Sequence, residues 1–277
     1  MTITIAALNI YPIKSCGGYS VDQTLALTSG LDGDRLFMVV DAATGLFVTQ
    51  RQWPQMARIT TRYRLDHVQV RAPGMLRLDL PIDVAGPPIT VTVWRDTLQA
   101  FDMGPVAAQW FSDFLQRDLR LVRFDPDQVR LSAGDWPGGS QVAHQFADGF
   151  PLLVLSRASM NDINQRLTAL GEEQLSINRF RANIVLDGLD AFEEDYLDTL
   201  QFGDVLVQLT RPCPRCEVPN TDQTTAVRGD QPMRMLASYR AKPAQQGAIC
   251  VGMNAYFSAG LEQTLAVGQT GLAKLAF

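Results

Sequence analysis

The sequence predicts a mainly β protein with some α-helix, and three observations carry this prediction. Short runs rich in β-branched residues, separated by turn residues, fill the first hundred residues. One later segment, residues 106–118, shows the apolar spacing of a helix, and Ser159 is a candidate cap for a second helix over residues 160–170. The early strands follow one another without intervening helices, which favours a barrel or rolled sheet over βαβ units. We therefore expect a barrel-like N-terminal region over residues 1–120, within a chain of 277 residues.

The expected strands of this region come in order along the chain. Residues 2–10 are rich in β-branched side chains and end at Pro12. Residues 36–50 read as a hairpin, since the turn DAATG separates two apolar runs. Residues 68–80 alternate on both sides of a Pro-Gly pair, and residues 89–102 alternate throughout. All four segments are predicted to form strands.

A helix is expected next, over residues 106–118, with Val106, Trp110, Phe111 and Leu115 on one apolar face. The pattern returns to a strand over residues 119–125. Several further elements complete the second half. They are a polar loop over 125–139, a buried strand over 151–156, a helix over 160–170 capped by Ser159, strands over 182–188 and 204–210, and the possible start of a strand at 236–240.

Composition limits the classes of function. Formal net charge is −5, from 24 Lys and Arg against 29 Asp and Glu, so neither nucleic acid nor an anionic membrane is an expected partner. Four cysteines in a chain of this length make no disulfide framework, which favours a reducing compartment. The N-terminus has no basic segment before its apolar run, and the longest apolar run, residues 150–155, is too short to span a bilayer. We expect a cytoplasmic protein.

Two thiols, Cys213 and Cys216, stand two residues apart at the end of an expected strand. A thioredoxin-type dithiol, half of a zinc site and a pair of ordinary buried thiols are all open interpretations. The flanking Arg211 and Arg215 favour the thiolate form, because nearby cations lower a thiol pKa. A single thiolate on a proline-stiffened loop is a plausible soft ligand for a redox metal.

Other fragments suggest anion binding. Lys14 and Ser15 precede two glycines, which is typical of an anion cradle but also of a plain turn. Arg35 opens an apolar strand, where it could clamp a phosphate or pterin or pair with a neighbouring aspartate. The segment NRFRAN, residues 178–183, places two arginines and two amides just before a buried strand. It could line a site or form a charged strand edge.

Taken together, the fragments YPIKSC, GDR, TQRQWP, PLLVLSRASMNDIN, NRFRANIVLDG and CPRCEVPNTDQTTAVRGDQPMRMLASYR resemble the MOSC family. The resemblance is to the branch with an N-terminal β-barrel domain, which includes the mitochondrial amidoxime-reducing components and bacterial hydroxylaminopurine reductases. It covers nearly the whole chain. It implies an N-terminal MOSC-type β-barrel domain over residues 1–120 and a MOSC β-barrel domain over residues 121–277.

The resemblance also implies a bound molybdenum cofactor, Mo-molybdopterin. Cys216 would be the catalytic metal ligand, and Cys213 a bystander or supporting thiol. The residues implied to hold or line the cofactor site are Lys14, Ser15, Arg35, Ser156, Arg157, Arg181, Asn183, Arg215 and Asn254. The chemistry fits, because an anionic pterin phosphate suits Lys, Arg and backbone donors, and molybdenum suits a soft thiolate.

The implied activity is reduction of small N-hydroxylated substrates such as hydroxylaminopurines, amidoximes and hydroxylamines, by cleavage of the N–O bond. No C-x4-C-x2-C spacing of a plant-type ferredoxin is present, so we expect a separate electron donor of ferredoxin, flavodoxin or flavin reductase type. The chain also starts directly at the first expected strand, which favours a bacterial-type cytoplasm. The alternative is a non-catalytic carrier of the molybdenum cofactor, or of sulfur through Cys216.

Overall fold

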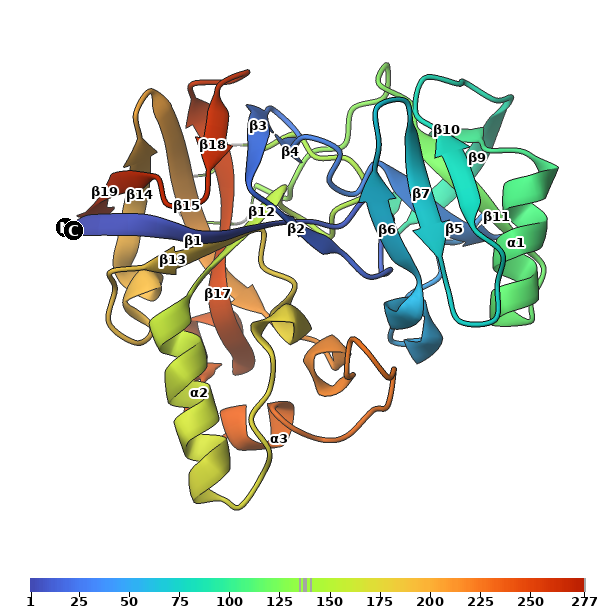
Figure 1. Cartoon of the computed structure of the whole chain (residues 1–277). Helices are drawn as coiled ribbons and strands as arrows, with labels where there is room; N and C mark the ends of the chain where they lie inside the picture. The colour runs from blue at the N-terminus through green and yellow to red at the C-terminus, as the bar shows by residue number, and fades with distance from the viewer. Residues whose placement is uncertain (135, 137–138, 140, 277) are drawn as a thin grey trace.

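A computed structural model describes residues 1–134, 136, 139 and 141–276. It confirms a mainly β protein, with a closed seven-stranded barrel and a smaller, open β part. Figure 1 shows the barrel on the left and the smaller part, with helix α1, on the right. The loop expected over residues 125–139 includes residues 135, 137 and 138, which lie outside the described residues.

The barrel closes because β12 pairs with both β13 and β17. Around the barrel the strands are β12 (Leu152–Ser156), β13 (Ile184–Asp187), β1 (Thr2–Ile10), β19 (Thr270–Leu275), β14 (Leu197–Phe202), β15 (Val205–Pro214) and β17 (Ala248–Ala259). The short strands β2 (Tyr19–Val21) and β16 (Ala241–Lys242) pair with β1 and β17. Apolar side chains of these strands fill the barrel interior, where a closed sheet leaves no exposed edge.

The first strand of the chain is built into this C-terminal barrel. Thr4 of β1 pairs with Asp187 of β13, and Thr2 pairs with Leu272 of β19. In Figure 1 this strand runs from the N-terminus across the barrel toward the smaller part. The chain leaves β1 between the two parts, so the residues that follow it can reach both.

The smaller part contains two antiparallel sheets and one helix. One sheet is β5 (Phe37–Asp41), β11 (Leu119–Phe124), β10 (Asp96–Asp102) and β9 (Pro88–Val93), and the other is β6 (Thr60–Tyr63), β7 (His67–Arg71) and β8 (Leu78–Pro81). A third small sheet, β18 (Thr264–Ala266), β3 (Gln23–Leu27) and β4 (Gly30–Leu31), joins segments from both ends of the chain. The predicted hairpin over residues 68–80 is confirmed as β7 and β8.

Helix α1 (Pro105–Leu115) covers a shared apolar core in this part. Trp110, Phe111 and Leu115 are buried as predicted, but Val106 is 72% exposed. The prediction for Val106 was wrong: this residue lies in the first turn, outside the apolar core that Trp110, Phe111 and Leu115 join. The remaining helices are α2 (Arg157–Ala169), α3 (Met233–Leu236) and the 3₁₀ helices η1 (Pro54–Arg58), η2 (Ile177–Phe180), η3 (Glu193–Tyr196), η4 (Val218–Asn220) and η5 (Pro243–Gln245).

Local corrections concern three predicted strands. The alternating run over residues 89–102 forms two strands, since Trp94 adopts a left-handed φ of 55° and turns the chain. Residues 46–50 do not form a full strand. They make isolated β-bridges, Phe47 with Val40 and Leu46 with Thr92. Residues 236–240 form the end of α3 and a turn, not the start of a strand.

The cap of α2 also differs from the prediction. Ser156, not Ser159, is the N-cap, and its hydroxyl accepts a hydrogen bond from the Ser159 backbone N–H at 3.0 Å. Both serines have the right side chain for capping, and the three-residue spacing alone does not choose between them. None of the helices in the described part of the chain combines the length and apolarity needed to cross a bilayer.

Candidate functional site

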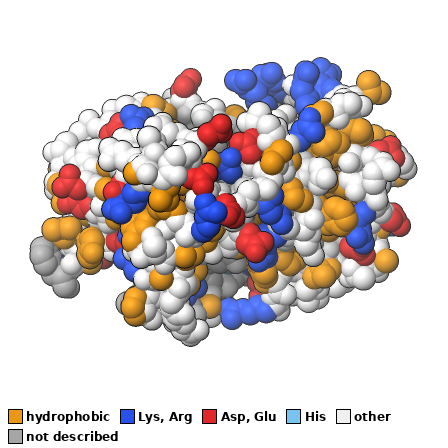
Figure 2. Space-filling model, turned by 90° about the horizontal axis from the view of Figure 1, so that it is seen from below, with side chains coloured by type: hydrophobic (Ala, Val, Ile, Leu, Met, Phe, Trp, Pro, Cys, Tyr) orange, Lys and Arg blue, Asp and Glu red, His pale blue; other side chains and the backbone are white. Residues whose placement is uncertain are grey.

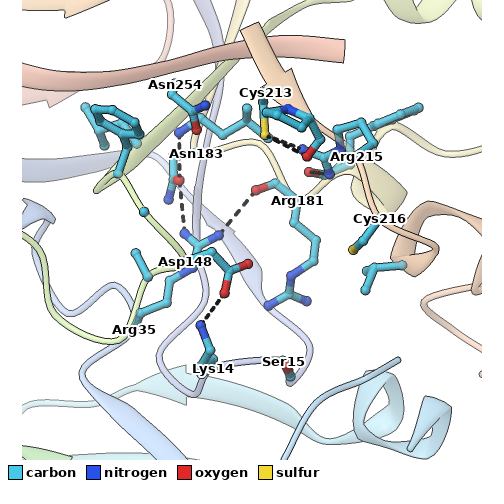
Figure 3. A pocket seen from close by; sticks show the side chains of 18 of the residues that line it. Lys14, Ser15, Arg35, Asp148, Arg181, Asn183, Cys213, Arg215, Cys216 and Asn254 are labelled. Atoms are coloured by element: carbon cyan, nitrogen blue, oxygen red, sulfur yellow. Dashed lines mark hydrogen bonds and ion pairs between the residues drawn. The ribbon is translucent and has the colours of Figure 1, made fainter. Parts of the chain in front are cut away.

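A pocket of about 300 Å³ lies where the barrel meets the smaller part. Eight of the residues proposed from the sequence line it: Lys14, Ser15, Arg35, Arg181, Asn183, Arg215, Cys216 and Asn254. They come from separate segments: the loop after β1, the turn before β5, the entry to β13, the loop after β15, and β17. Figure 3 shows their side chains gathered around one space.

The pocket concentrates positive charge. Among the described residues, five cationic side chains line it, those of Lys14, Arg35, Arg181, Arg211 and Arg215, against the carboxylate of Asp148. The chain as a whole carries a net charge of −5. On the face drawn in Figure 2, Lys and Arg side chains are interspersed with Asp and Glu. The excess of cations therefore marks the pocket and suits an anionic ligand.

Three of these residues have a backbone conformation that side chains rarely adopt. The φ angles are 65° at Ser15, 52° at Arg35 and 57° at Arg181. A left-handed conformation costs a non-glycine residue on the order of 1 kcal/mol or more, and such residues cluster at ligand sites. The shared conformation indicates that packing elsewhere holds these side chains in place around the pocket.

Lys14 and Asp148 form an ion pair at one wall of the pocket. The Lys14 ammonium also donates to the Phe146 carbonyl at 2.7 Å, and Trp94 Nε1 donates to Asp148 at 3.0 Å. Burial lowers the pKa of Lys14, an effect that Asp148 opposes. The desolvation that raises the pKa of Asp148 is outweighed by Lys14, so this pKa stays well below its usual range.

Arg35 is fixed by partners from both halves of the chain. Its guanidinium pairs with the buried Asp34 and donates to Asn183 Oδ1 at 3.0 Å. Asn183 is itself fully buried, and its amide group is hydrogen-bonded. Its oxygen accepts from the Leu153 N–H at 3.2 Å, and its nitrogen donates to the Asn9 carbonyl at 3.2 Å. The aspartate pairing considered for Arg35 and its position in the pocket thus occur together.

The two thiols at the end of β15 differ in environment. Cys216 is exposed on the pocket wall, whereas Cys213 is half-buried and accepts a hydrogen bond from Arg215 Nη1 at 3.2 Å. Arg215 also donates from Nη2 to the Phe180 carbonyl at 2.8 Å. Its Nε is buried and has no hydrogen-bond partner within the described residues. A buried donor without a partner costs free energy unless a ligand accepts from it.

The pocket fits a metal that arrives with most of its own ligands. In residues 1–134, 136, 139 and 141–276, no group of three or more His, Cys, Asp and Glu side chains could hold a metal ion. A zinc-type site is therefore not present in that part of the chain. One exposed thiol beside several cations, with an unsatisfied arginine Nε, suits an anionic cofactor that carries its own metal.

Ser156 and Arg157, also implied by the resemblance, do not line the pocket. Ser156 is buried at the start of α2, where its backbone N–H donates to Glu194 Oε1 at 3.2 Å. Arg157 is exposed and pairs with Asp187 at 2.7 Å. Both residues serve the helix and the strand beside it rather than the pocket wall.

Sequence reasoning missed several lining residues. Asp148 and Phe150 precede β12, and only their place just before a buried strand could have suggested them. Gln50 is buried and donates to the Ser15 carbonyl at 3.1 Å, which supports the left-handed turn there. Arg211 was singled out only as a neighbour of the thiols, yet it lines the pocket.

The fragment that begins with CPRC ends in SYR, residues 238–240, and the arginine of this ending has a structural role. Arg240 is buried, donates to the Cys250 carbonyl at 2.9 Å and forms an ion pair with Asp195 at 2.6 Å. Lys242 joins the same carboxylate at 2.9 Å. This cluster ties the segment before β17 to η3, and Arg240 does not line the pocket.

Comparison with protein-family models assigns nearly the whole chain. The MOSC N-terminal beta barrel domain matches residues 2–118, and the MOSC domain matches residues 141–270. Among solved structures, the YUAD protein from Bacillus subtilis aligns over 100% of this chain and 98% of its own, at 10% identity and a TM-score of 0.44.

Curated relatives match over most of the chain. Mitochondrial amidoxime reducing component 2 of Bos taurus is 39% identical over 249 residues, which are 86% of this chain and 72% of the relative. Mitochondrial amidoxime-reducing component 1 of Homo sapiens is 34% identical, with coverage of 86% and 72%. Molybdenum cofactor sulfurase of Bos taurus is 30% identical over 88% of this chain but only 29% of the sulfurase. The chain belongs to the MOSC family, in the group that joins a MOSC N-terminal β-barrel domain to a MOSC domain.

Proposed function

We propose that this protein is a molybdenum-cofactor-dependent reductase of small N-hydroxylated compounds. The overall reaction is R–NHOH + 2e⁻ + 2H⁺ → R–NH₂ + H₂O, in which the N–O bond breaks. The observation that carries the proposal is an exposed thiol, Cys216, on a pocket whose described lining has five cations and one carboxylate. The amidoxime-reducing components among its relatives support the reaction class.

Each part of the pocket has a role in this proposal. The Cys216 thiolate is the protein's ligand to the metal, and the cations hold the anionic parts of the cofactor. The cofactor, when bound, supplies the two-electron chemistry that N–O cleavage requires. Arg215 offers its unsatisfied Nε to that group, and the amides of Asn183 and Asn254 line the same pocket.

Electrons come, in this proposal, from a separate protein of ferredoxin, flavodoxin or flavin reductase type. The substrate is a small molecule, and neither nucleic acid nor a membrane is a partner. A cytoplasmic location is part of the same proposal. The net charge of −5 supports the exclusion of nucleic acid and of an anionic membrane, because both bind positively charged protein surfaces.

The test is metal content and turnover in parallel. Molybdenum is measured by elemental mass spectrometry in wild type, Cys216→Ala and Cys213→Ala, all expressed with molybdate in cells that make the cofactor. We expect about one molybdenum per chain in wild type and Cys213→Ala, and its loss in Cys216→Ala. Turnover of N-hydroxylated substrates with a chemical reductant should follow the metal.

Two outcomes would contradict the proposal. Full molybdenum in Cys216→Ala would remove the ligand role. Metal-loaded wild type without turnover of any N-hydroxylated substrate would instead favour the carrier function. A sulfur carrier would show a persulfide on Cys216 after incubation with a cysteine desulfurase.

A further inference from the structure

Two pocket arginines share one aromatic ring. The guanidinium carbon of Arg35 lies 4.5 Å from the centre of the Tyr11 ring, and that of Arg181 lies 4.3 Å from it. Both arginines line the pocket, whereas Tyr11 is buried behind them and does not. Figure 3 shows the two arginine side chains approaching from different segments. Tyr11 is thus the point at which they meet.

The ring itself is held firmly. The Tyr11 backbone N–H donates to Asp34 Oδ1 at 2.8 Å, and its hydroxyl is 3.4 Å from the Ala182 carbonyl. A Cβ atom at Gly18 would come within 2.3 Å of the ring, so the backbone of Gly18 packs directly against it. The phenol is 4% exposed. These contacts leave the ring little room to move.

The Tyr11 ring offsets the repulsion between the two like-charged arginines. Two half-buried guanidinium groups of like charge share this ring, and like charges repel each other. Burial and then the charge of Arg35 lower the pKa of Arg181. Arg35 has the carboxylate of Asp34, while Arg181 donates to the Cys16 carbonyl at 2.6 Å. The negative face of an aromatic ring attracts cations without neutralising them, so both remain able to bind an anion.

We propose that Tyr11 is a positioning residue of the pocket, which holds the guanidinium groups of Arg35 and Arg181 preset for one anionic group. The identity of that group as the cofactor's phosphate or pterin rests on the proposed function. The positioning itself does not, because it is a property of the protein alone. It is therefore testable with a simple anion.

The first measurement is spectroscopic. In the full-length chain, prepared from cells that lack the cofactor and labelled with ¹⁵N-arginine, two guanidinium signals should be shifted by the ring current. They should keep that shift in Tyr11→Phe and lose it in Tyr11→Leu, since phenylalanine keeps the ring. Absence of shifted signals in wild type would overturn the proposal.

The second measurement is binding of inorganic pyrophosphate to the same cofactor-free proteins by calorimetry. We expect binding to weaken on the order of tenfold in Tyr11→Leu and to stay within about twofold in Tyr11→Phe. Phe111→Leu is the matched control, since Phe111 of α1 is fully buried in the apolar core of the smaller part, where its ring packs against Trp110. The Phe111→Leu protein should have a lower free energy of unfolding but the same affinity for pyrophosphate as wild type.

The outcomes separate this proposal from the proposed function. Equal affinity in wild type and Tyr11→Leu, an equal loss in Phe111→Leu, or no pyrophosphate binding in wild type would each overturn the role of Tyr11. Molybdenum content of wild type, from cells that make the cofactor, reports on the proposed function alone. A protein that binds pyrophosphate through Tyr11-positioned arginines but takes up no molybdenum would retain this inference and lose the other.

Discussion

Arg215 donates a hydrogen bond to the Sγ of Cys213 at 3.2 Å, and this contact distinguishes the environment of Cys213 from that of Cys216. Cys213 is half-buried and anchors the arginine, which also holds the Phe180 carbonyl. Cys216 lies on the exposed side of the loop, on the pocket wall. In the proposed function, this difference in environment makes Cys216 the metal ligand and Cys213 a supporting thiol, although both line the pocket.

Thiol alkylation should follow this division. At pH 8 in the native, metal-free protein, iodoacetamide should modify Cys216 fastest, because it is exposed. Cys16 and Cys250 should react only after unfolding, since burial raises the pKa of Cys16 to about 12 and that of Cys250 to about 11. At pH 8 the thiolate fraction of Cys16 is then on the order of one in ten thousand.

Peptide mass spectrometry of timed samples would check this order. Cys216→Ser is the control that should remove the fast phase. Rapid native labelling of Cys16 would show that the loop after β1 opens, and would contradict the complete burial of this thiol.

Local patterns predicted the strands well because alternation and turn residues act over short distances. The hairpin of β7 and β8 is an example, with its Pro-Gly turn visible in the sequence. The place of β1 in the C-terminal barrel is not visible, because its partners β13 and β19 follow more than 170 residues later. Pairing over such distances depends on the whole fold.

The site shows the same limit. Arg35 and Arg181 each stood out as an arginine beside a strand, but nothing local indicates that they share the ring of Tyr11. Ser156 and Arg157 entered the predicted site through resemblance alone. The N-cap rule, applied one turn earlier, already gives Ser156 a structural reason to be there.

Replacing Ser156 should therefore affect stability rather than the pocket. Ser156→Ala should lower the free energy of unfolding by about 1 kcal/mol, because the Ser159 N–H loses its cap. Arg157→Gln, on an exposed pair with Asp187, should change it by less than about 1 kcal/mol. Both variants should keep the molybdenum content of wild type, whereas Arg181→Gln should lose most of it.

Urea unfolding and elemental analysis of the same preparations would check these expectations. Loss of molybdenum in Ser156→Ala, with an unfolding midpoint close to that of wild type, would mean that Ser156 does take part in cofactor binding.

Arg240 should be among the most sensitive arginines for stability. Its ion pair with Asp195 is buried, with side chains 7% and 3% exposed. Arg240→Leu leaves that carboxylate with Lys242 alone and should lower the free energy of unfolding by about 3 kcal/mol. Arg234→Leu is the matched control. Its pair with Glu172 is exposed, so less than about 1 kcal/mol should be lost.

Chemical denaturation of both variants at neutral pH would measure the difference. Similar losses in the two variants would mean that Lys242 and water compensate for Arg240, and that the SYR fragment has another role.

His144 should make the protein less stable in mild acid. It is 3% exposed, with Nδ1 at 3.3 Å from Arg130 Nη1, and burial followed by the charge of Arg130 lowers its pKa from 6.5 to about 4. The unfolded chain therefore takes up this proton first as the pH falls. The contribution of His144 to stability is complete above about pH 6.5 and declines toward pH 4, by roughly 3 kcal/mol.

His144→Gln isolates this contribution from that of other titrating groups. Its side-chain oxygen can still accept from Arg130, but it cannot take up a proton. We expect the variant to lose less unfolding free energy than wild type between pH 6.5 and pH 4, measured by urea denaturation at several pH values. Parallel pH profiles for the two proteins would mean that water reaches His144 in the native state, which would contradict its burial.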